Sequence, residues 1–446
     1  MKIAVIGGGS TYTPELVKGF LERTAQLPLR ELWLMDVDQH RLAIVGGFVQ
    51  RMVEAQGHPF RVVLTTDRRE ALAGAAYVCT QLRVGQMEAR RQDEYLARRH
   101  GLIGQETTGV GGLAKALRTI PVILDIAREM KAVAPDAWLI NFTNPAGLIV
   151  EALNRYIPEV RAVGVCNVPY TAKIQFLALL KESTGREIVP GQAELKTLGL
   201  NHLTWHYGLT IEGEDFWPYV LRAFIQKVRG QEHPEWEPRY LESTRMIPNY
   251  YLHYYYHTDE KLHEQAHWPP SRAEQVMQIE AQLLKQYADP TRVDLPPDLM
   301  RRGGAYYSTV ATQLISAHYN NLGEVHVVNV PHRGAVKEWD AQWVLELPAR
   351  ISRQGIEPLP AQPLPPFAFG LVTTVKAYEI LTVRAAAEGD VEAAYQALIT
   401  HPLGPRLNRA EAVLEDILAT NWPFLLQFHG RVTPPKRVSV APDRDQ

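Results

Sequence analysis

The stretch Lys2–Asp38 decides the fold, and it reads KIAVIGGGSTYTPELVKGFLERTAQLPLRELWLMDVD. Its apolar, β-branched start at residues 2–6 predicts a buried strand, and the glycines that follow let the backbone approach a ligand phosphate. Thr13 is suited to cap a helix that begins at Pro14. A second apolar run ends at Asp36, where a carboxylate can bind the hydroxyl pair of a ribose. This order of elements is typical of a dinucleotide-binding βαβ unit.

The glycine turn departs at one position from the dinucleotide pattern G-x-G-x-x-G. Gly7 and Gly9 fit the pattern, but Tyr12 stands where the third glycine is expected. A turn that only reverses the chain is therefore the alternative to a nucleotide site. The whole unit favours the site, and the acid after the second strand favours NAD over NADP. The residues predicted to bind this cofactor are Gly7, Gly9, Ser10, Thr11 and Asp36.

Apolar runs alternate with helical patterns through the first third of the chain and predict an α/β fold. Residues 1–165 are predicted to form an NAD-binding domain with a Rossmann-like, doubly wound sheet. One of its helices is expected over residues 113–133, where Pro121 would break it. Residues 166–446 are less regular and predict an α+β domain for substrate binding, metal binding and oligomerisation. The tail from Thr433 is expected to be loosely ordered.

The composition excludes several classes of protein. Among 446 residues, 47 Lys and Arg stand against 49 Asp and Glu, a net charge of −2 that gives no reason to expect nucleic acid or an anionic membrane as partner. Glycines cut off the first apolar run, and no stretch of about 18 apolar residues follows. We therefore expect a cytoplasmic protein. Two cysteines exclude a disulfide-rich scaffold and a Cys₄ zinc site.

Two residues could bind a catalytic metal ion. Cys166 follows an apolar strand, and His202 ends the motif Gly199-Leu200-Asn201-His202. Taken alone, each is more often a structural residue of the core. One thiolate and one imidazole cannot complete a structural zinc site, but they can form an open site that substrate oxygens and water complete. Such a site suits Mn²⁺ or another divalent cation.

Three further motifs carry groups that could do chemistry. Glu106 lies in a glycine-rich run over residues 100–112, which favours either a ligand-binding backbone or a mobile loop. The tyrosine run at 250–256 favours core packing, unless cations lower a tyrosine pKa from about 10 and make it a base. His263 and His267 match the H-E-x-x-H zinc motif, but prolines follow directly, so we interpret the match as chance.

The chain resembles glycoside hydrolase family 4. The motifs that carry the resemblance are GGGSTYTPEL at 7–16, GQETTG at 104–109, NFTNP at 141–145, CNVP at 166–169, GLNH at 199–202 and RAE at 272–274. They span most of the chain. Asn167, after the cysteine, is similar to the 6-phospho-β-glucosidase branch, whereas α-acting members carry Asp there.

The resemblance implies hydrolysis of 6-phospho-β-glucosides, such as phosphorylated β-linked disaccharides, by an unusual route. NAD⁺ would take a hydride from C3 of the sugar, and a base would then remove the acidified C2 proton. The aglycone would leave by β-elimination, water would add, and NADH would return the hydride. A divalent cation, Mn²⁺ in this family, would stabilise the charge that develops on the sugar oxygens.

The resemblance also implies roles for single residues. Cys166 and His202 match the metal ligands. Tyr251 matches the catalytic base, although the extra tyrosines leave Tyr254 and Tyr255 as alternatives. Glu106 matches the carboxylate that raises the basicity of this tyrosine. The positions that match substrate contacts are Arg90, Asn144, Asn167 and Arg272.

Several questions stay open at this point. The planar fork of Arg272 suits a phosphate. Asn167 cannot donate a proton as a carboxylic acid would, so the acid that protonates the leaving group is unassigned. The family suggests a homodimer or homotetramer. The alternatives are another family 4 glycosidase, with α-linked or non-phosphorylated substrates, a simple NAD-dependent sugar or polyol dehydrogenase, and an NAD-responsive binding protein without activity.

Overall fold

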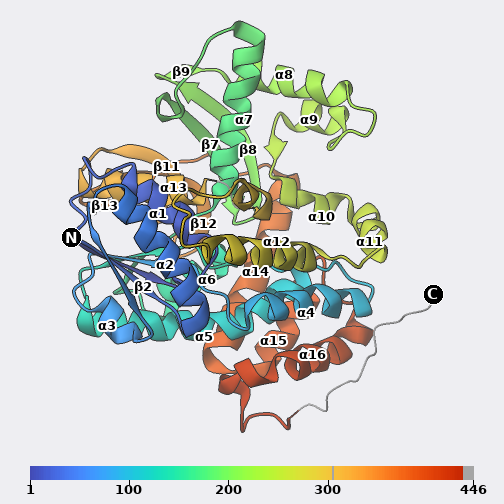
Figure 1. The fold of residues 1–446 in the computed structure, drawn as a ribbon. Coiled ribbons are helices and arrows are strands. Elements are labelled where there is room, and N and C mark those ends of the chain that lie inside the picture. Colours follow the sequence, from blue (N-terminus) through green and yellow to red (C-terminus); the bar gives the residue numbers. More distant parts are fainter. Residues whose placement is uncertain (304–305, 435–446) are drawn as a thin grey trace.

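A mixed sheet of 13 strands runs through the computed structural model, which describes residues 1–303 and 306–434 (Figure 1). The tail beyond residue 434, expected to be loosely ordered, lies outside the described residues. The parallel strands are β1 (Lys2–Ile6), β2 (Glu31–Met35), β3 (Arg61–Thr65), β4 (Tyr77–Thr80), β5 (Trp138–Asn141) and β6 (Arg161–Gly164). The others are β7 (Ala193–Leu200), β8 (Leu203–Ile211), β9 (Glu214–Asp215), β10 (Ile247–Pro248), β11 (Glu324–Pro331), β12 (Val344–Ser352) and β13 (Gly355–Pro358).

Helices cover both faces of the sheet, and further helices follow in the C-terminal half of the chain. They are α1 (Thr13–Leu21), α2 (Gln39–Ala55), α3 (Arg68–Leu72), α4 (Gln86–Arg99), α5 (Gly109–Val133), α6 (Ala146–Tyr156), α7 (Asn167–Thr184) and α8 (Trp217–Arg229). The later ones are α9 (Pro238–Thr244), α10 (His253–Tyr256), α11 (Thr258–Ala266), α12 (Arg272–Tyr287), α13 (Tyr307–Tyr319), α14 (Pro366–Glu388), α15 (Val391–Thr400) and α16 (Leu407–Asn421).

The N-terminal strands confirm the predicted α/β fold. They follow the order β3-β2-β1-β4-β5-β6, and all their pairings are parallel. This is the strand order of a dinucleotide-binding sheet, in which ligands bind beyond the carboxyl ends of the strands. The helix α1 begins one residue earlier than expected, since Thr13 is already helical and its hydroxyl donates to the Gly8 carbonyl, at 2.9 Å.

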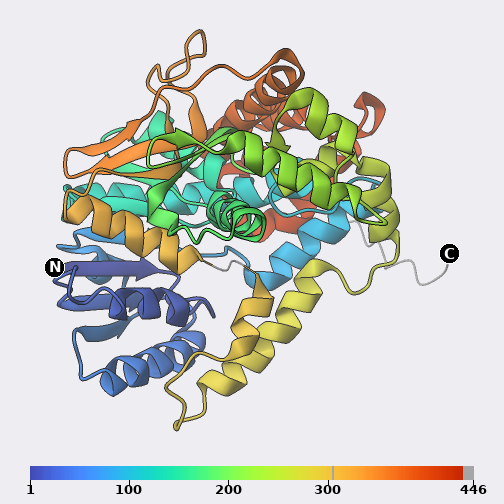
Figure 2. The same ribbon diagram turned by 90° about the horizontal axis from the view of Figure 1, so that it is seen from above.

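The second half of the chain extends the same sheet with antiparallel strands. Strand β11 pairs with β6 where Asn329 lies opposite Gly164, and β12, β7 and β8 follow outward. Helix α13 packs against α1, α14 packs against α5 and α6, and α12 lies against α2 and α4 (Figures 1 and 2). The C-terminal elements thus return to cover the N-terminal sheet. The division of the chain at residue 165 stays a prediction.

The expected break at Pro121 was wrong, because α5 runs unbroken through that residue. A proline inside a helix leaves the carbonyl four residues earlier without its usual donor. Here that carbonyl belongs to Leu117, and the side-chain amide of Gln427 donates to it at 2.8 Å. A long-range hydrogen bond therefore replaces the lost helical one. Within the described residues, no helix has the length and apolar character needed to cross a bilayer.

Candidate functional site

A cavity of about 1280 Å³ opens at the carboxyl ends of the parallel strands. Elements from both halves of the chain line it, including the β1–α1 turn, α4, the β7–β8 turn and the start of α12. The predicted site residues in its lining are Gly7, Gly9, Ser10, Asp36, Arg90, Glu106, Asn144, Asn167, His202, Tyr251 and Arg272. Of the predicted set, Thr11 and Cys166 lie outside this lining.

The glycine turn and Asp36 form one end of the cavity. The Gly9 N–H donates to Asp36 Oδ2 at 2.8 Å, and the Asp38 N–H donates to Oδ1 at 3.0 Å, which orients the carboxylate. A Cβ atom at position 9 would lie 2.9 Å from Asp36 Oδ2. Gly7 has a φ of 94°, and a Cβ there would meet the Gln81 backbone at 2.9 Å. Both glycines are thus required by close approach.

Thr11 and Tyr12 differ from what the dinucleotide pattern suggests. The hydroxyl of Thr11 is buried and donates to Glu280 Oε1 at 3.1 Å, so its side chain does not face the cavity. Tyr12, which replaces the third glycine, lines the cavity instead. The guanidinium of Arg302 lies over its ring, 4.5 Å from the centroid. The departure from the glycine pattern therefore places an aromatic ring and a cation beside the turn.

His202 lines the cavity, and Cys166 contacts it from outside the lining. Cys166 precedes α7, His202 lies in the turn between β7 and β8, and Cys166 Sγ is 3.6 Å from His202 Nε2. Sulfur and nitrogen ligands held at roughly 2.3 and 2.1 Å from a metal at a tetrahedral angle also lie about 3.6 Å apart. Both side chains are buried. The pair fits two ligands of one divalent cation.

The electrostatics of the pair also fit a metal site. Burial lowers the pKa of His202 to about 3, so the imidazole is neutral, which is the form that binds metals. Burial raises the pKa of the Cys166 thiol, and a bound cation acts in the opposite direction. His202 has a φ of 65°, a conformation that is uncommon outside glycine and that often marks functional turns.

The tyrosine run brings one ring onto His202. The Tyr251 ring stacks on the imidazole with centroids 3.8 Å apart and planes 4° from parallel. Burial and then the neighbouring Tyr250 raise the pKa of Tyr251 well above its ordinary value. Tyr254 also lines the cavity. Tyr255 does not line it, and its hydroxyl lies 2.6 Å from Thr108 Oγ1. Of the three candidate bases, Tyr251 is the one stacked on the proposed metal ligand.

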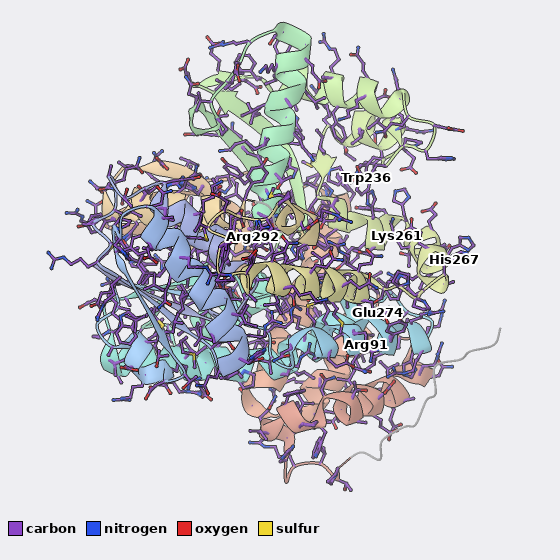
Figure 3. The ribbon with its side chains drawn as sticks, viewed as in Figure 1. Arg91, Trp236, Lys261, His267, Glu274 and Arg292 are labelled. Carbon is purple, nitrogen blue, oxygen red and sulfur yellow. The ribbon has the colours of Figure 1, made fainter. Side chains whose placement is uncertain are left out.

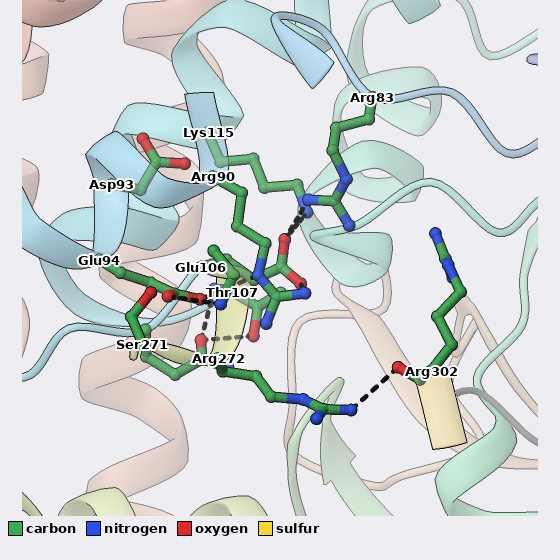
Figure 4. Close-up of polar contacts among 12 residues, drawn as sticks. Arg83, Arg90, Asp93, Glu94, Glu106, Thr107, Lys115, Ser271, Arg272 and Arg302 are labelled. Atoms are coloured by element: carbon green, nitrogen blue, oxygen red, sulfur yellow. Dashed lines mark hydrogen bonds and ion pairs between the residues drawn. The ribbon is translucent and has the colours of Figure 1, made fainter. Parts of the chain in front are cut away.

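Glu106 lies among three cations (Figure 4). Its carboxylate accepts from Arg83, from Arg90 Nη1 at 2.9 Å and from Lys115 Nζ at 2.5 Å. Burial favours protonation of Glu106, but the three cations outweigh it and hold its pKa well below the ordinary value. Burial, together with Arg83, lowers the pKa of Lys115 to about 7. Glu106 is therefore an ionised anchor for the cationic wall of the cavity.

A second carboxylate, Glu94, links Arg90 to the first turn of the helix that Arg272 begins (Figure 4). Glu94 accepts from Arg90 Nε at 2.9 Å through one oxygen and from the Ala273 N–H, at the start of α12, through the other. Arg272 begins that helix, and its guanidinium donates to the Arg302 carbonyl at 2.9 Å while staying exposed. Arg272 thus lies at the rim of the cavity, where it can reach an incoming anion.

Lys115 and Thr107 were not among the predicted site residues. Lys115 is a lone charge between Leu113 and Leu117 in an apolar helical run, and this isolation is the signal that could have identified it. Thr107 follows Glu106 in the glycine-rich run, and its hydroxyl lies 3.0 Å from His202 Nδ1. That contact depends on how α5 and the β7–β8 turn pack, which the local sequence does not indicate.

The H-E-x-x-H match lies away from the cavity. His263 is in the last turn of α11, and His267 lies just beyond its end, at the outer edge of the molecule (Figure 3). Their rings pack edge to face with centroids 5.0 Å apart, and neither lines the cavity. Across the described ranges, no group of three or more His, Cys, Asp or Glu side chains could hold a metal ion.

Comparisons with known proteins identify the family. The sequence matches the family described as "Family 4 glycosyl hydrolase" over residues 2–182 and its C-terminal domain over residues 197–404. It is 39% identical to the "Probable 6-phospho-beta-glucosidase" of Bacillus subtilis, over 97% of this chain and 99% of the relative. It is 37% identical to the 6-phospho-beta-glucosidase of Escherichia coli, over 96% and 97%.

A solved structure shares the fold over nearly the whole chain. It is the 6-phospho-beta glucosidase of Thermotoga maritima with manganese, NAD⁺ and glucose-6-phosphate, at 35% identity and a TM-score of 0.87. The match covers 95% of this chain and 99% of that one. The resemblance in the sequence motifs is thereby confirmed: the chain belongs to family 4 of the glycosyl hydrolases.

Proposed function

We propose that this protein hydrolyses 6-phospho-β-glucosides with the help of NAD and a divalent cation. The observation that carries the proposal is that one cavity is lined by the dinucleotide turn at Gly7 and Gly9 and by His202, which contacts Cys166 at 3.6 Å. The relatives support the substrate class, since those from B. subtilis and E. coli are named for this activity. The T. maritima structure supports both cofactors, because it holds manganese and NAD⁺.

The glycine turn and Asp36 would hold the NAD. When bound, NAD would take a hydride from the sugar and later return it. Gly7 and Gly9 leave the backbone open to the pyrophosphate, and Ser10 adds a hydroxyl at the same edge. Asp36 would accept from the ribose hydroxyls, since its backbone contacts already fix its orientation. Thr11, whose hydroxyl bonds to Glu280, would contribute through its backbone alone.

Cys166 and His202 would hold the divalent cation. When bound, the cation would act as a Lewis acid that stabilises negative charge on the sugar oxygens. The residues present two donor atoms 3.6 Å apart in a buried wall, and they leave the remaining positions to oxygen ligands. Two protein ligands do not complete a coordination shell, so substrate binding and metal binding would depend on each other.

Tyr251 would remove the C2 proton. Its stacking on His202 places the phenol beside the metal ligand, where a cation lowers the cost of forming the phenolate. Arg90 is a second cation near Tyr251. Burial lowers the pKa of Arg90, but Glu106, Glu94 and Tyr251 together raise it, so the guanidinium stays charged. Glu106 would act through Arg90 rather than by touching the base, because its oxygens are occupied by three cations.

The substrate would lie between α4, the β5–α6 loop and the start of α12. Arg90 and Asn144 would contact sugar hydroxyls, and Asn167 would contribute from the first turn of α7. Arg272 would bind the C6 phosphate, because its exposed guanidinium at the cavity rim suits a planar, bidentate contact with phosphate oxygens.

The competing function is a simple NAD-dependent dehydrogenase, and one assay separates the two. An aryl 6-phospho-β-glucoside is incubated with the protein, NAD⁺ and Mn²⁺, and both the released phenol and the NADH absorbance are followed. Our proposal expects many equivalents of phenol per protein with no net NADH, because the hydride returns to the sugar in each turnover. Net NADH formation in proportion to product would contradict it and favour the dehydrogenase.

Location and assembly belong to the same proposal. Cys79 and Cys166 are both free thiols, which suits a reducing cytoplasm. The family resemblance suggests a homodimer or homotetramer, which light scattering of the purified protein would reveal as a mass of two or four chains. We also retain the division into an NAD-binding domain over residues 1–165 and a substrate, metal and oligomerisation domain over residues 166–446.

A further inference from the structure

A chain of three polar side chains leads from the loop before α5 to the ring of His202. The Gln105 side chain folds back over its own loop, where Oε1 accepts from the backbone N–H groups of Thr107 and of Thr108, the latter at 3.1 Å. Two backbone donors converge on this atom, so it must be the amide oxygen and not the nitrogen. The acceptor end of Gln105 is therefore fixed by the backbone.

The Thr107 hydroxyl has one hydrogen, and its contact with Gln105 Oε1 needs that hydrogen, because an amide oxygen can only accept. Thr107 Oγ1 donates to Gln105 Oε1 at 2.8 Å, and the same Oγ1 lies 3.0 Å from His202 Nδ1. Because the hydroxyl hydrogen points to the amide, the oxygen can only accept from the imidazole. His202 Nδ1 must then carry a hydrogen. All three side chains are buried, with at most 8% of each exposed.

The tautomer of His202 follows from this chain. A neutral imidazole carries one hydrogen, so Nε2 is left with a lone pair. That nitrogen faces Cys166 Sγ at 3.6 Å, and the stacked Tyr251 ring covers one face of the imidazole. Metal-binding histidines in general are oriented by an acceptor on their other ring nitrogen, most often a carboxylate or a carbonyl. Here a threonine hydroxyl, polarised by an amide, takes that place.

We propose that Thr107, held by Gln105, is a positioning residue that selects the Nδ1–H tautomer of His202 and so presents Nε2 as a ligand for the divalent cation. The inference rests on the metal site of the proposed function. Without the hydroxyl, the hydrogen of the imidazole is free to sit on Nε2, facing Cys166. Metal binding would then require a change of tautomer first, and the affinity for the cation would fall.

The test is Mn²⁺ binding, measured from the electron paramagnetic resonance signal of free Mn²⁺ with the full chain and no NAD or sugar. T107V, which keeps the shape but loses the hydroxyl, is expected to bind Mn²⁺ roughly 10- to 100-fold more weakly than the wild type. T107S keeps the hydroxyl and is expected to retain most of the affinity. T107V binding Mn²⁺ as tightly as the wild type would overturn the inference.

Thr108 provides a matched control. It is the next residue in the same loop and is equally buried, but its hydroxyl lies 2.6 Å from the Tyr255 hydroxyl and does not reach His202. T108V is therefore expected to bind Mn²⁺ like the wild type. Equal losses in T107V and T108V would mean that the loop is disturbed as a whole, which would overturn a specific role for Thr107.

C166A separates failure of the inference from failure of the metal site. If C166A binds Mn²⁺ as well as the wild type, the Cys166–His202 pair is not the site, and both proposals fall. If C166A loses the cation while T107V retains it, the site stands and the role of Thr107 falls. The expected result is that C166A and T107V are both weakened while T107S is not.

A measurement on the unmodified, metal-free chain covers the case in which T107V does not fold. Two-bond ¹H–¹⁵N correlation spectra of protein labelled with ¹⁵N-histidine distinguish the two tautomers, and H202Q identifies the signal by its loss. The expected pattern is a protonated Nδ1 and an unprotonated Nε2 for His202. A protonated Nε2 would overturn the inference.

Discussion

The ring of Tyr251 lies flat against the imidazole of His202, with centroids 3.8 Å apart and an angle of 4° between the planes. The imidazole Nε2 in turn faces Cys166 Sγ at 3.6 Å. The phenol thus stacks on the face of the imidazole, and the thiol contacts its Nε2 edge. This arrangement couples the proposed base to the proposed metal ligands, so changes in the three residues should have separable effects.

Removing the phenol oxygen should stop catalysis and leave metal binding intact. Y251F keeps the ring that stacks on His202 but cannot accept a proton, and general base catalysis contributes typically about 10²- to 10⁴-fold. We expect kcat to fall by at least about 10²-fold while the Mn²⁺ affinity stays within a small factor of the wild type. Steady-state kinetics and metal titration check both values. Y255F is the control, because its hydroxyl contacts Thr108 outside the cavity, and it should retain most activity.

Shortening Arg272 should act on the phosphate group of the substrate. The guanidinium is exposed at the cavity rim, and charge-assisted hydrogen bonds contribute about 1.5–3 kcal/mol. R272A should therefore lower kcat/KM for an aryl 6-phospho-β-glucoside roughly 10- to 100-fold, mainly by raising KM. For a glucoside without phosphate, kcat/KM of the same variant should equal that of the wild type. R91A is the control, because Arg91 pairs with Glu88 and does not line the cavity. Equal losses on both substrates would argue against phosphate binding by Arg272.

Removing the Asp36 carboxylate should weaken NAD binding and its selectivity. Asp36 accepts from the Gly9 and Asp38 N–H groups and keeps lone pairs for the ribose hydroxyls. D36A should lower the affinity for NAD⁺ about tenfold or more, and it should lower the preference for NAD⁺ over NADP⁺, since the carboxylate no longer repels a 2′-phosphate. Fluorescence titration with both cofactors measures this. An unchanged ratio of the two affinities would contradict the proposed role.

Removing one partner of a buried ion pair should lower the free energy of unfolding. Arg118 holds both oxygens of Asp93, at 2.8 and 2.6 Å, and both side chains are fully buried. R118A leaves an uncompensated buried carboxylate, which costs about 3–5 kcal/mol of unfolding free energy. R128A breaks the exposed pair with Asp125 and should cost at most about 1 kcal/mol. Urea denaturation of the two variants under identical conditions compares them. Similar midpoints would mean that the buried pair contributes little.

Local patterns in the sequence were sufficient for the parallel half of the sheet and for the glycine turn and Asp36 at one end of the cavity. The apolar runs, the glycines at 7 and 9 and the acid at 36 are all close together in the chain, and their spacing reflects backbone geometry directly. The order of the six parallel strands agreed with this interpretation. Cys166 and His202 were predicted as candidate metal ligands from their residue types and then matched the family motifs, and the structure brings them within 3.6 Å.

Contacts between distant segments could not be predicted in this way. The antiparallel half of the sheet joins the parallel half where Asn329 lies opposite Gly164, a pairing between residues far apart in the chain. The helix through Pro121 depends on a hydrogen bond from Gln427 to the Leu117 carbonyl. Lys115 points into the site only because α5 turns that side of the helix toward Glu106. Each depends on packing of elements that a local pattern does not describe.

The exchange of the C2 proton tests the central claim most directly. An aryl 6-phospho-β-glucoside is hydrolysed in D₂O with the protein, NAD⁺ and Mn²⁺, and the glucose 6-phosphate formed is examined by proton NMR. Removal of the C2 proton by Tyr251, followed by elimination and addition of water, predicts deuterium at C2 of the product. Hydrolysis that leaves the original hydrogen at C2 would contradict the account.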